Sequence, residues 1–219
     1  MTRPYDAVVF DLDGVICHTD MYHYRGWKSV AEDLGVAFDE TKNNRLRGVS
    51  RMESLDIILE AYQGEPLTDA RKTEIATIKN ARYREMLSEM SPADLDPSVR
   101  ATLDGLRSRG LKLAIGSSSK NARFILARIG LGDYFDEISD GTNISRSKPD
   151  PEVFLKAAEY LGIDPAKCVV IEDAVAGIEA GEAAGMYTVA IGDAADQGAG
   201  DAKLGTFADL SKVMSDLGC

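Results

Sequence analysis

Two aspartates separated by one residue, Asp11 and Asp13, follow the apolar run 5–10 and precede Gly14. Side chains two positions apart at the end of a strand face the same side, so both carboxylates can reach one space. Near a cation, such a pair can divide into a nucleophile and a proton carrier. The alternative is a strand-to-turn junction in which Asp side chains accept hydrogen bonds from backbone N–H groups. These residues alone favour neither interpretation.

A run of polar side chains, Ser117-Ser118-Ser119-Lys120-Asn121, follows a later apolar run. Hydroxyls and backbone amides at the start of a helix suit a phosphate group, but Ser119 could equally cap the helix expected from Lys120. Lys148, in a loop before another expected helix, is a compact charge suited to a phosphoryl oxygen. Most loop lysines are instead simply solvated.

Two further acids, Glu172 and Asp173, end the apolar run 168–172. Their hard carboxylate oxygens, together with Asp11, would complete a Mg²⁺ site. The alternative is an acidic cap on the following helix, whose dipole favours negative charge at that end. Each polar group therefore has an ordinary structural explanation, but their arrival in order after successive apolar runs favours chemistry.

The apolar runs predict the sheet that would bring these groups together. They are rich in β-branched residues without alternation, which is typical of parallel strands covered on both faces. Helical segments alternate with them, as in an open parallel α/β sheet, where ligands bind beyond the carboxyl ends of the strands. We expect a surface loop over the Gly/Ala/Asp-rich residues 192–205. The expected strands are residues 5–10, 111–116, 135–139 (weaker), 168–172 and 186–191, and the expected helices are 97–109, 120–129, 151–161 and 174–184.

The stretch between the first two expected strands is much longer than one crossover needs, and its pattern of apolar residues predicts helix over almost its whole length. We therefore expect an α/β fold with a Rossmann-like open parallel sheet core and an inserted α-helical cap domain. The core would comprise residues 1–15 and 91–219, and the cap residues 16–90. Chain breaks around residues 17–19 and 91–97 would be the hinges.

The composition limits the classes of partner. The chain has 219 residues, with 25 Lys and Arg against 36 Asp and Glu, and a formal charge of −11. This acidity argues against nucleic acid and anionic membranes as partners, and no apolar run approaches the ~18 residues of a membrane span. Asp11 and Asp13 interrupt the first apolar stretch, so it does not resemble a signal peptide. Cys17, Cys168 and Cys219 are too scattered for a disulfide framework. We expect a cytoplasmic protein, and the acidic surface suggests a monomer.

Together the motifs resemble the four-motif signature of the haloacid dehalogenase superfamily, in its helical-cap subclass. The resemblance implies Mg²⁺ as cofactor, held by Asp11, Glu172, Asp173 and the backbone carbonyl of Asp13. The segments that carry it are VVFDLDGV, the strand ending in Ser117, KPDP from Lys148, and IEDA with Gly177.

That resemblance also assigns roles in phosphoryl transfer. Asp11 would be the nucleophile that becomes phosphorylated, and Asp13 the general acid and base. Ser117, Ser118 and Lys148 would bind the transferring phosphoryl group. Because the residue at position 13 is an aspartate that can act as a general acid, the resemblance argues against dehalogenation and for phosphoryl transfer.

Further segments resemble the β-phosphoglucomutase subfamily: YHYRGW from residue 22, RGVSRMES from 47, SPAD from 91 and SSSKN from 117. This resemblance implies sugar phosphates as small-molecule partners and a second phosphate position. His23 and Lys79 would orient substrate and Asp13, with Trp27 near the sugar and Thr19 at the hinge. The implied specificity loop is Gly48, Val49, Ser50 and Arg51, and the second phosphate would be held by Arg51, Ser119, Lys120 and Asn121.

Ordinary alternatives exist for the cap residues too. His23 and Trp27 are four apart and could be a packed pair on one helix face. Arg51 could be a solvated charge on a helix capped by Ser50, and Lys79 could face water. Cys17 departs from the subfamily pattern and is expected to be a buried thiol rather than a nucleophile.

Three functions follow from these alternatives. The first is interconversion of β-glucose 1-phosphate and glucose 6-phosphate through a phospho-aspartate and β-glucose 1,6-bisphosphate. The second is a Mg²⁺-dependent sugar-phosphate phosphatase, in which water attacks phosphorylated Asp11. The third is a non-catalytic sugar-phosphate sensor, which is disfavoured because Asp11, Asp13, Glu172 and Asp173 are all present.

Overall fold

The computed structural model describes residues 4–46 and 49–219. Within them, parallel strands form one sheet in the order β3-β2-β1-β4-β5-β6. The order changes direction between β1 and β4, and this switch point is where open α/β sheets bind ligands. The expected Rossmann-like α/β fold is confirmed. The strands are β1 (Ala7–Phe10), β2 (Lys112–Gly116), β3 (Glu137–Ser139), β4 (Cys168–Glu172), β5 (Tyr187–Ala190) and β6 (Ala202–Lys203).

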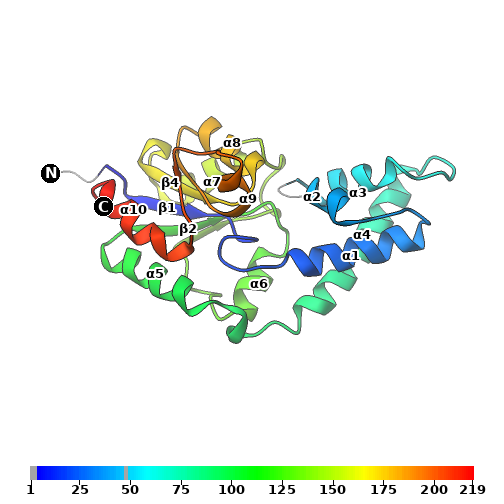
Figure 1. The fold of residues 1–219 in the computed structure, drawn as a ribbon, viewed down its shortest axis with the longest axis horizontal. Helices are drawn as coiled ribbons and strands as arrows, with labels where there is room; N and C mark the ends of the chain where they lie inside the picture. Colours follow the sequence, from blue (N-terminus) through cyan, green and yellow to red (C-terminus); the bar gives the residue numbers. More distant parts are fainter. Residues whose placement is uncertain (1–3, 47–48) are drawn as a thin grey trace.

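Strand β1 shows why the sheet residues are apolar without alternation. Val8 and Phe10 point into one apolar cluster and Ala7 and Val9 into another, and all four side chains are buried. Helices therefore cover both faces, as parallel sheets require. Figure 1 shows α7 and α8 over one face and α5 and α10 over the other. The helices around the sheet are α5 (Pro97–Ser108), α6 (Ala122–Arg128), α7 (Glu152–Leu161), α8 (Val175–Ala183), α9 (Gly192–Asp196) and α10 (Leu210–Asp216).

The insert between β1 and β2 is helical, as expected, and forms a group beside the sheet (Figure 1). It has its own apolar cluster, which includes Trp27, Leu55 and Ile75. The end of α4 packs differently, because Tyr83 and Leu87 belong to the cluster under the sheet. The cap boundaries at residues 16 and 90 stay a prediction. The helices are α1 (Asp20–Asp33), α2 (Glu40–Asn44), α3 (Arg51–Leu59) and α4 (Asp69–Leu87).

Segment 192–205, expected to be a surface loop, contains α9 and β6 instead, so that prediction was wrong. Strand β6 pairs in parallel with β5. The Asp201 carboxylate accepts hydrogen bonds from Thr188 N at 2.8 Å and Thr188 Oγ1 at 3.0 Å. Ala194 of α9 is buried against Ile178 and Ala190. These contacts are tertiary, and composition alone does not reveal them. The other expected elements appear within two residues of their expected ends.

None of the helices in the described ranges combines the length and the apolar character needed to cross a membrane.

Candidate active site

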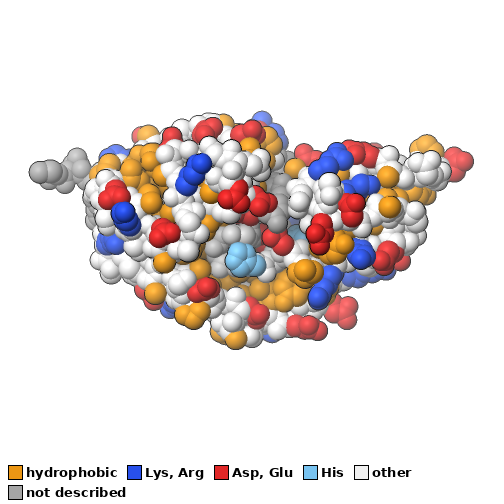
Figure 2. All heavy atoms as spheres, viewed as in Figure 1, with side chains coloured by type: hydrophobic (Ala, Val, Ile, Leu, Met, Phe, Trp, Pro, Cys, Tyr) orange, Lys and Arg blue, Asp and Glu red, His pale blue; other side chains and the backbone are white. Residues whose placement is uncertain are grey.

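A cavity of about 570 Å³ lies between the carboxyl ends of the strands and the helical insert. Figure 2 shows a notch in the surface where the two parts meet. Every predicted site residue that the structure describes lines this cavity, except Thr19; Gly48 lies outside the described residues. The predicted residues that line it are Asp11, Asp13, His23, Trp27, Val49, Ser50, Arg51, Lys79, Ser117, Ser118, Ser119, Lys120, Asn121, Lys148, Glu172 and Asp173.

Three carboxylates meet at the floor of the cavity. Asp11 directly follows β1, and its backbone N–H donates to Ile171 O in β4 at 2.9 Å. This pairing brings Asp11 beside Glu172, the last residue of β4, and Asp173. One carboxylate oxygen from each of the three acids lies within 4.8 Å of the others. Neighbouring parallel strands therefore bring together the three carboxylates whose role as metal ligands the sequence predicted, and that role stays a prediction.

Lys148 contacts this cluster from the loop before α7. Its Nζ donates to Asp11 Oδ1 and lies 3.4 Å from Glu172 Oε1, and its side chain is 1% exposed. Burial lowers the pKa of Lys148, but Asp11 and Glu172 outweigh burial and raise it above its usual value. The lysine is therefore charged. The alternative of a solvated loop lysine is wrong.

The carboxylate cluster fits a divalent cation. Burial raises the pKa of Glu172 well above its usual range; Lys148 counters this effect, and Asp11 and Asp173 add to it. Lys148 supplies one positive charge against three carboxylates, so a further cation would favour the ionised form of Glu172. Buried oxygen ligands of this kind suit Mg²⁺.

Two glycines leave room for these carboxylates. Gly14 has φ +90°, and a Cβ there would lie 2.1 Å from Asp173 Oδ2. Gly177, on the first turn of α8, would place a Cβ 1.7 Å from Glu172 Oε1. Any larger residue at either position would therefore push a carboxylate out of the cluster.

Asp13 lies apart from the three clustered carboxylates. Its Oδ1 accepts a hydrogen bond from Thr19 Oγ1. Thr19 precedes α1 and is fully buried, and its hydroxyl does not cap that helix. Burial raises the pKa of Asp13 to about 7; Asp11 adds to this rise and the Thr19 hydrogen bond opposes it. Asp13 can therefore hold or release a proton near neutral pH, while a Mg²⁺ contact through its backbone carbonyl stays a prediction.

On the cap side, Lys79 is 2% exposed, so the alternative that it faces water is wrong. Its Nζ lies 3.1 Å from His23 Nδ1, 4.9 Å from the Trp27 ring centroid and 4.3 Å from that of Tyr83. Burial and Arg51 lower the pKa of Lys79 to about 7, while Asp13 opposes this. Burial, Lys79 and Arg51 also lower the pKa of His23 well below its usual value. The resemblance also implies a hydrogen bond between His23 and Asp13, but within the described residues the hydrogen-bond partner of His23 is Lys79.

Arg51 begins α3 and enters the cavity. Its Nη2 donates to Asn80 Oδ1 at 2.8 Å, and burial lowers its pKa. Ser50 caps the helix, as the structural alternative proposed, because its Oγ accepts from Glu53 N at 3.2 Å. Ser50 also lines the cavity, so capping and a place in the site are compatible.

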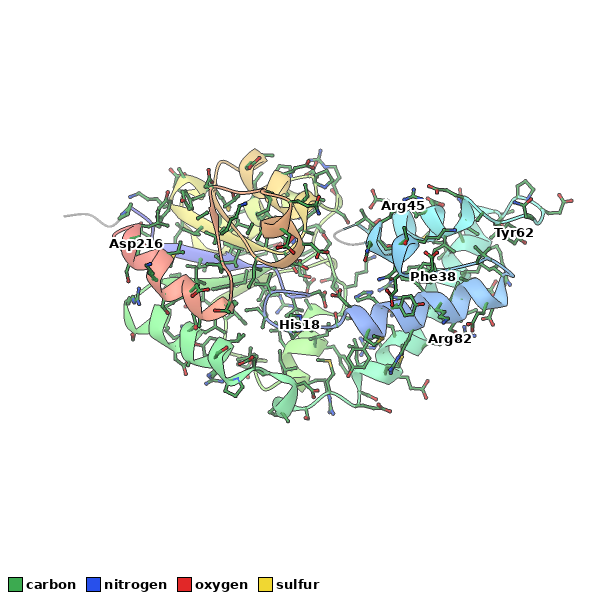
Figure 3. All side chains as sticks on the ribbon, in the orientation of Figure 1. His18, Phe38, Arg45, Tyr62, Arg82 and Asp216 are labelled. Carbon is green, nitrogen blue, oxygen red and sulfur yellow. The ribbon has the colours of Figure 1, made fainter. Side chains whose placement is uncertain are left out.

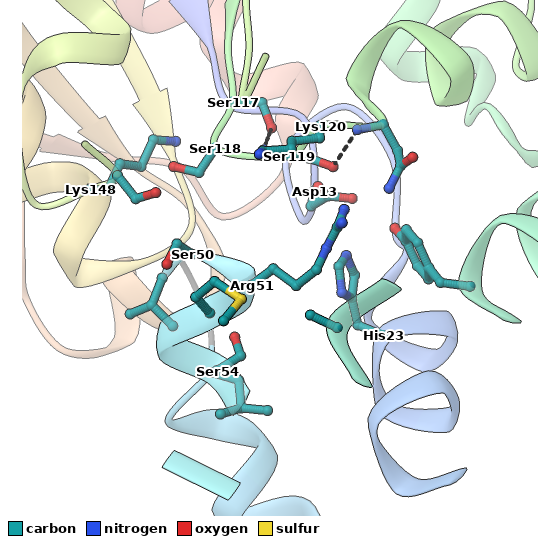
Figure 4. A pocket seen from close by; sticks show the side chains of 18 of the residues that line it. Asp13, His23, Ser50, Arg51, Ser54, Ser117, Ser118, Ser119, Lys120 and Lys148 are labelled. Carbon is teal, nitrogen blue, oxygen red and sulfur yellow. Dashed lines mark hydrogen bonds between the residues drawn. The ribbon is translucent and has the colours of Figure 1, made fainter. Parts of the chain in front are cut away.

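The loop after β2 forms the opposite wall, where Figure 4 shows Ser117, Ser118 and Lys120 across from Arg51 and His23. Ser117 Oγ accepts from Ser119 N, and Ser119 Oγ accepts from Asn121 N, each at 3.2 Å. Helix α6 begins only at Ala122, so Ser119 organises the loop rather than capping the helix. Ser118 Oγ is buried without a hydrogen-bond partner in the described residues. An oxygen-rich ligand in the cavity would supply one.

Cys17, which departs from the subfamily pattern, and its neighbour His18 do not line the cavity. Cys17 is buried, and burial raises the pKa of its thiol well above the usual value. The thiol therefore stays protonated, as expected for a structural cysteine. His18 is exposed, where the chain passes from the sheet to α1 (Figure 3).

Comparison with known proteins agrees with this geometry. The haloacid dehalogenase-like hydrolase family matches residues 5–185. The chain belongs to this family. It is 44% identical over 187 residues to a β-phosphoglucomutase of Bacillus subtilis, covering 85% of this chain and 83% of that protein. The crystal structure of a β-phosphoglucomutase from Clostridium difficile superposes with a TM-score of 0.91 at 34% identity, covering 98% of this chain and 97% of that one. A phosphorylated carbohydrates phosphatase of Thermotoga maritima is 33% identical, covering 84% and 83% of the two chains.

The sequence analysis did not single out several polar residues of this haloacid dehalogenase-like site, among them Tyr83, which lines the cavity, and Asn80, which contacts Arg51. Tyr83 lines the cavity with its hydroxyl buried and without a partner in the described residues, and its ring lies 4.2 Å from that of His23. The available signal was spacing, since Tyr83 follows Lys79 by one helical turn. Asn80 was missed because a lone asparagine on a charged helix carries no motif. Arg45 and Tyr62, which Figure 3 labels on the cap, do not line the cavity.

Proposed function

We propose that the protein is a β-phosphoglucomutase, which interconverts β-glucose 1-phosphate and glucose 6-phosphate. The observation that carries this proposal is the presence of two cationic positions in one cavity. Lys148 lies beside Asp11 on the core side, and Arg51 enters from the cap side. A phosphatase needs only the first, whereas a sugar with two phosphates would use both.

In this proposal the core side performs phosphoryl transfer. Asp11 carries the phosphoryl group, while Ser117, Ser118 and Lys148 hold its oxygens. Mg²⁺, held by Asp11, Glu172, Asp173 and the backbone carbonyl of Asp13, would neutralise charge on those oxygens. Asp13 acts as the acid and base, for which a pKa of about 7 is suited.

The cap side holds and orients the sugar. Arg51 binds the phosphate that is not being transferred, together with Ser119, Lys120 and Asn121. His23 and Lys79 orient the substrate relative to Asp13. Trp27 and the loop of Gly48, Val49 and Ser50 shape the sugar pocket. The cap (residues 16–90) turns about Thr19 and residues 91–97, and a monomer suffices because one chain supplies every group named here.

The reaction proceeds in two transfers. The 6-hydroxyl oxygen of β-glucose 1-phosphate attacks the phosphorus on Asp11; the bond from phosphorus to the Asp11 oxygen breaks, and Asp13 takes the hydroxyl proton. The resulting β-glucose 1,6-bisphosphate turns over in the cavity. Asp11 then attacks the 1-phosphoryl group, and Asp13 returns its proton to the departing 1-oxygen. Glucose 6-phosphate and phosphorylated Asp11 result.

The second candidate is a sugar-phosphate phosphatase, favoured by the identity to the Thermotoga maritima phosphatase. It shares the first half-reaction, after which water takes the phosphoryl group from Asp11. The two candidates differ in whether the cavity excludes water while the phospho-aspartate exists.

One experiment separates the candidates. The protein is mixed with Mg²⁺, β-glucose 1-phosphate and a trace of glucose 1,6-bisphosphate, and glucose 6-phosphate and inorganic phosphate are followed separately. A mutase forms glucose 6-phosphate with little free phosphate. Phosphate release without glucose 6-phosphate would support the phosphatase, and the absence of both products would support a sensor.

A further inference from the structure

Asn80 joins the two sides of the cavity. Its Oδ1 accepts hydrogen bonds from Arg51 Nη2 at 2.8 Å and from Asn121 Nδ2 at 2.9 Å. Asn121 Oδ1 in turn accepts from Arg84 Nη1 at 3.2 Å. The result is a continuous relay from Arg51 on α3, through Asn80 on α4, to Asn121 in the loop before α6.

The arginines fix how both amides point. A guanidinium can only donate hydrogen bonds, so Arg51 requires the oxygen of Asn80 to face it and Arg84 requires the oxygen of Asn121. The amide nitrogen of Asn121 is thereby directed at Asn80. The relay is self-consistent, and reversing either amide would place a donor against a donor.

The relay holds Arg51 without cancelling its charge. Asn80 is neutral, and none of the ion pairs between described residues involves Arg51. A carboxylate at residue 80 would accept the same hydrogen bond but would neutralise the guanidinium. A half-buried cation that is oriented but not neutralised remains able to attract an anion.

The relay also crosses the boundary between the helical insert and the sheet. Asn80 lies in the middle of α4, whereas Asn121 follows β2 and is 4% exposed. A movement that separated the cap from the core would break the Asn80–Asn121 hydrogen bond and part Arg51 from Asn121. The two residues proposed to share a phosphate are therefore neighbours only while the cavity is closed.

We propose that Asn80 is a positioning residue that unites Arg51 and Asn121 into one anion-binding unit and so makes the closed enzyme select sugars that carry a second phosphate. This inference rests on the proposed two-phosphate function. It adds a specificity determinant that the sequence motifs did not indicate.

The test measures binding without turnover. In an Asp11→Asn background with Mg²⁺, calorimetry compares the affinities for β-glucose 1,6-bisphosphate and glucose 6-phosphate. The parent should prefer the bisphosphate, and Asn80→Ala should reduce that preference about tenfold, as expected for loss of a hydrogen bond to a charged group. Asn80→Asp keeps the hydrogen-bond acceptor and the side-chain shape, so its melting temperature should match that of the parent. It should nevertheless lose the preference for the bisphosphate, because its carboxylate neutralises Arg51. Asn44→Ala, on the exposed end of α2, is the matched control and should retain it.

The outcomes are distinguishable. If both Asn80 variants keep the parent's preference, the inference is overturned and the proposed function stands. If Asn80→Asp restores the preference that Asn80→Ala loses, Asn80 is merely a structural acceptor and the inference is likewise overturned. If the parent itself shows no preference for the bisphosphate, the two-phosphate function fails, whatever the Asn80 variants do.

Discussion

The two walls of the cavity hold their charges in opposite ways. On the core wall, the carboxylates of Asp11 and Glu172 surround Lys148, and the cation is paired with anions. On the cap wall, Lys79 contacts an imidazole and aromatic rings, and Arg51 contacts an amide. The cap wall thus presents cations beside neutral partners.

The difference shows which ligand each wall requires. The core wall has more negative than positive charge, so a metal cation would complete it. The cap wall has positive charge that burial makes costly, so an anion would stabilise it. The lowered pKa values of Lys79 and Arg51 reflect the burial of positive charge without a paired anion in the described part of the chain. A phosphate between the walls would meet both needs, since its oxygens can bind metal and cations alike.

The largest effect should come from removing the carboxylate that reacts. Asp11→Asn keeps the shape of the core wall but cannot form the phospho-aspartate, so turnover of β-glucose 1-phosphate should fall on the order of 10⁴-fold or more. A coupled assay of glucose 6-phosphate formation measures this, and a thermal melt establishes that the variant is folded. Turnover within tenfold of the parent would exclude Asp11 as the nucleophile.

The next largest effect should come from crowding the proposed metal ligands. Gly177→Ala places a methyl group where Glu172 Oε1 now lies, 1.7 Å from the added Cβ. The displaced carboxylate should weaken Mg²⁺ affinity on the order of 100-fold, read from activity against Mg²⁺ concentration.

Gly105→Ala is the matched control, because a Cβ at Gly105 meets no heavy atom within 4 Å. It lies inside α5, where alanine should stabilise the helix by roughly 0.5–1 kcal/mol and leave the Mg²⁺ dependence unchanged. If Gly177→Ala behaves like this control, Glu172 is not part of the metal site.

The two walls also differ in how far their residues could be predicted from the sequence. The core wall was predictable because its acids lie at or just after strand ends, Lys148 lies in a loop on the same side, and parallel strands end at one edge. The order of Asp11, Ser117, Lys148 and Glu172 therefore implied their proximity. The strand ends were off by up to two residues, which did not matter because the polar residues themselves mark the edge.

The cap wall was harder to predict because its geometry depends on helix packing. Lys79 reads as a surface residue in a mixed-charge helix, and only the aromatic rings of Trp27 and Tyr83 explain its burial. Asn80 acts through contacts to residues 29 and 41 positions away. No local pattern encodes such contacts, so the resemblance located Arg51 and Lys79 but not Asn80 and Tyr83, which contact them.

A moderate effect is expected from weakening the cap wall. Arg51→Ala removes the cation that Asn80 orients, so mutase activity should fall about tenfold or more, as for loss of a charged hydrogen bond. Turnover of a small monophosphate such as acetyl phosphate uses the core wall alone and should fall less. The two rates are measured on the same preparation. Equal losses on both substrates would contradict the assignment of Arg51 to the second phosphate.

The smallest effect concerns the cost of burying Lys79. Its pKa is lowered to about 7 by burial and Arg51 in the folded state, against about 10.4 in an unfolded chain. Between these values the unfolded chain binds a proton that the folded chain does not, so stability rises with pH through this window. Below pH 7 both states are protonated and the cost is fully present.

Lys79→Met should remove this dependence. Between pH 7 and pH 8 the free energy of unfolding of the parent should rise by about 1 kcal/mol relative to the variant, since the folded lysine releases its proton over this range. Urea unfolding of both proteins at the two pH values measures the difference. Lys28→Met, on the exposed face of α1, is the control and should follow the parent. Parallel curves for the parent and Lys79→Met would mean that a partner neutralises Lys79 and that the cap wall is not an uncompensated cationic surface.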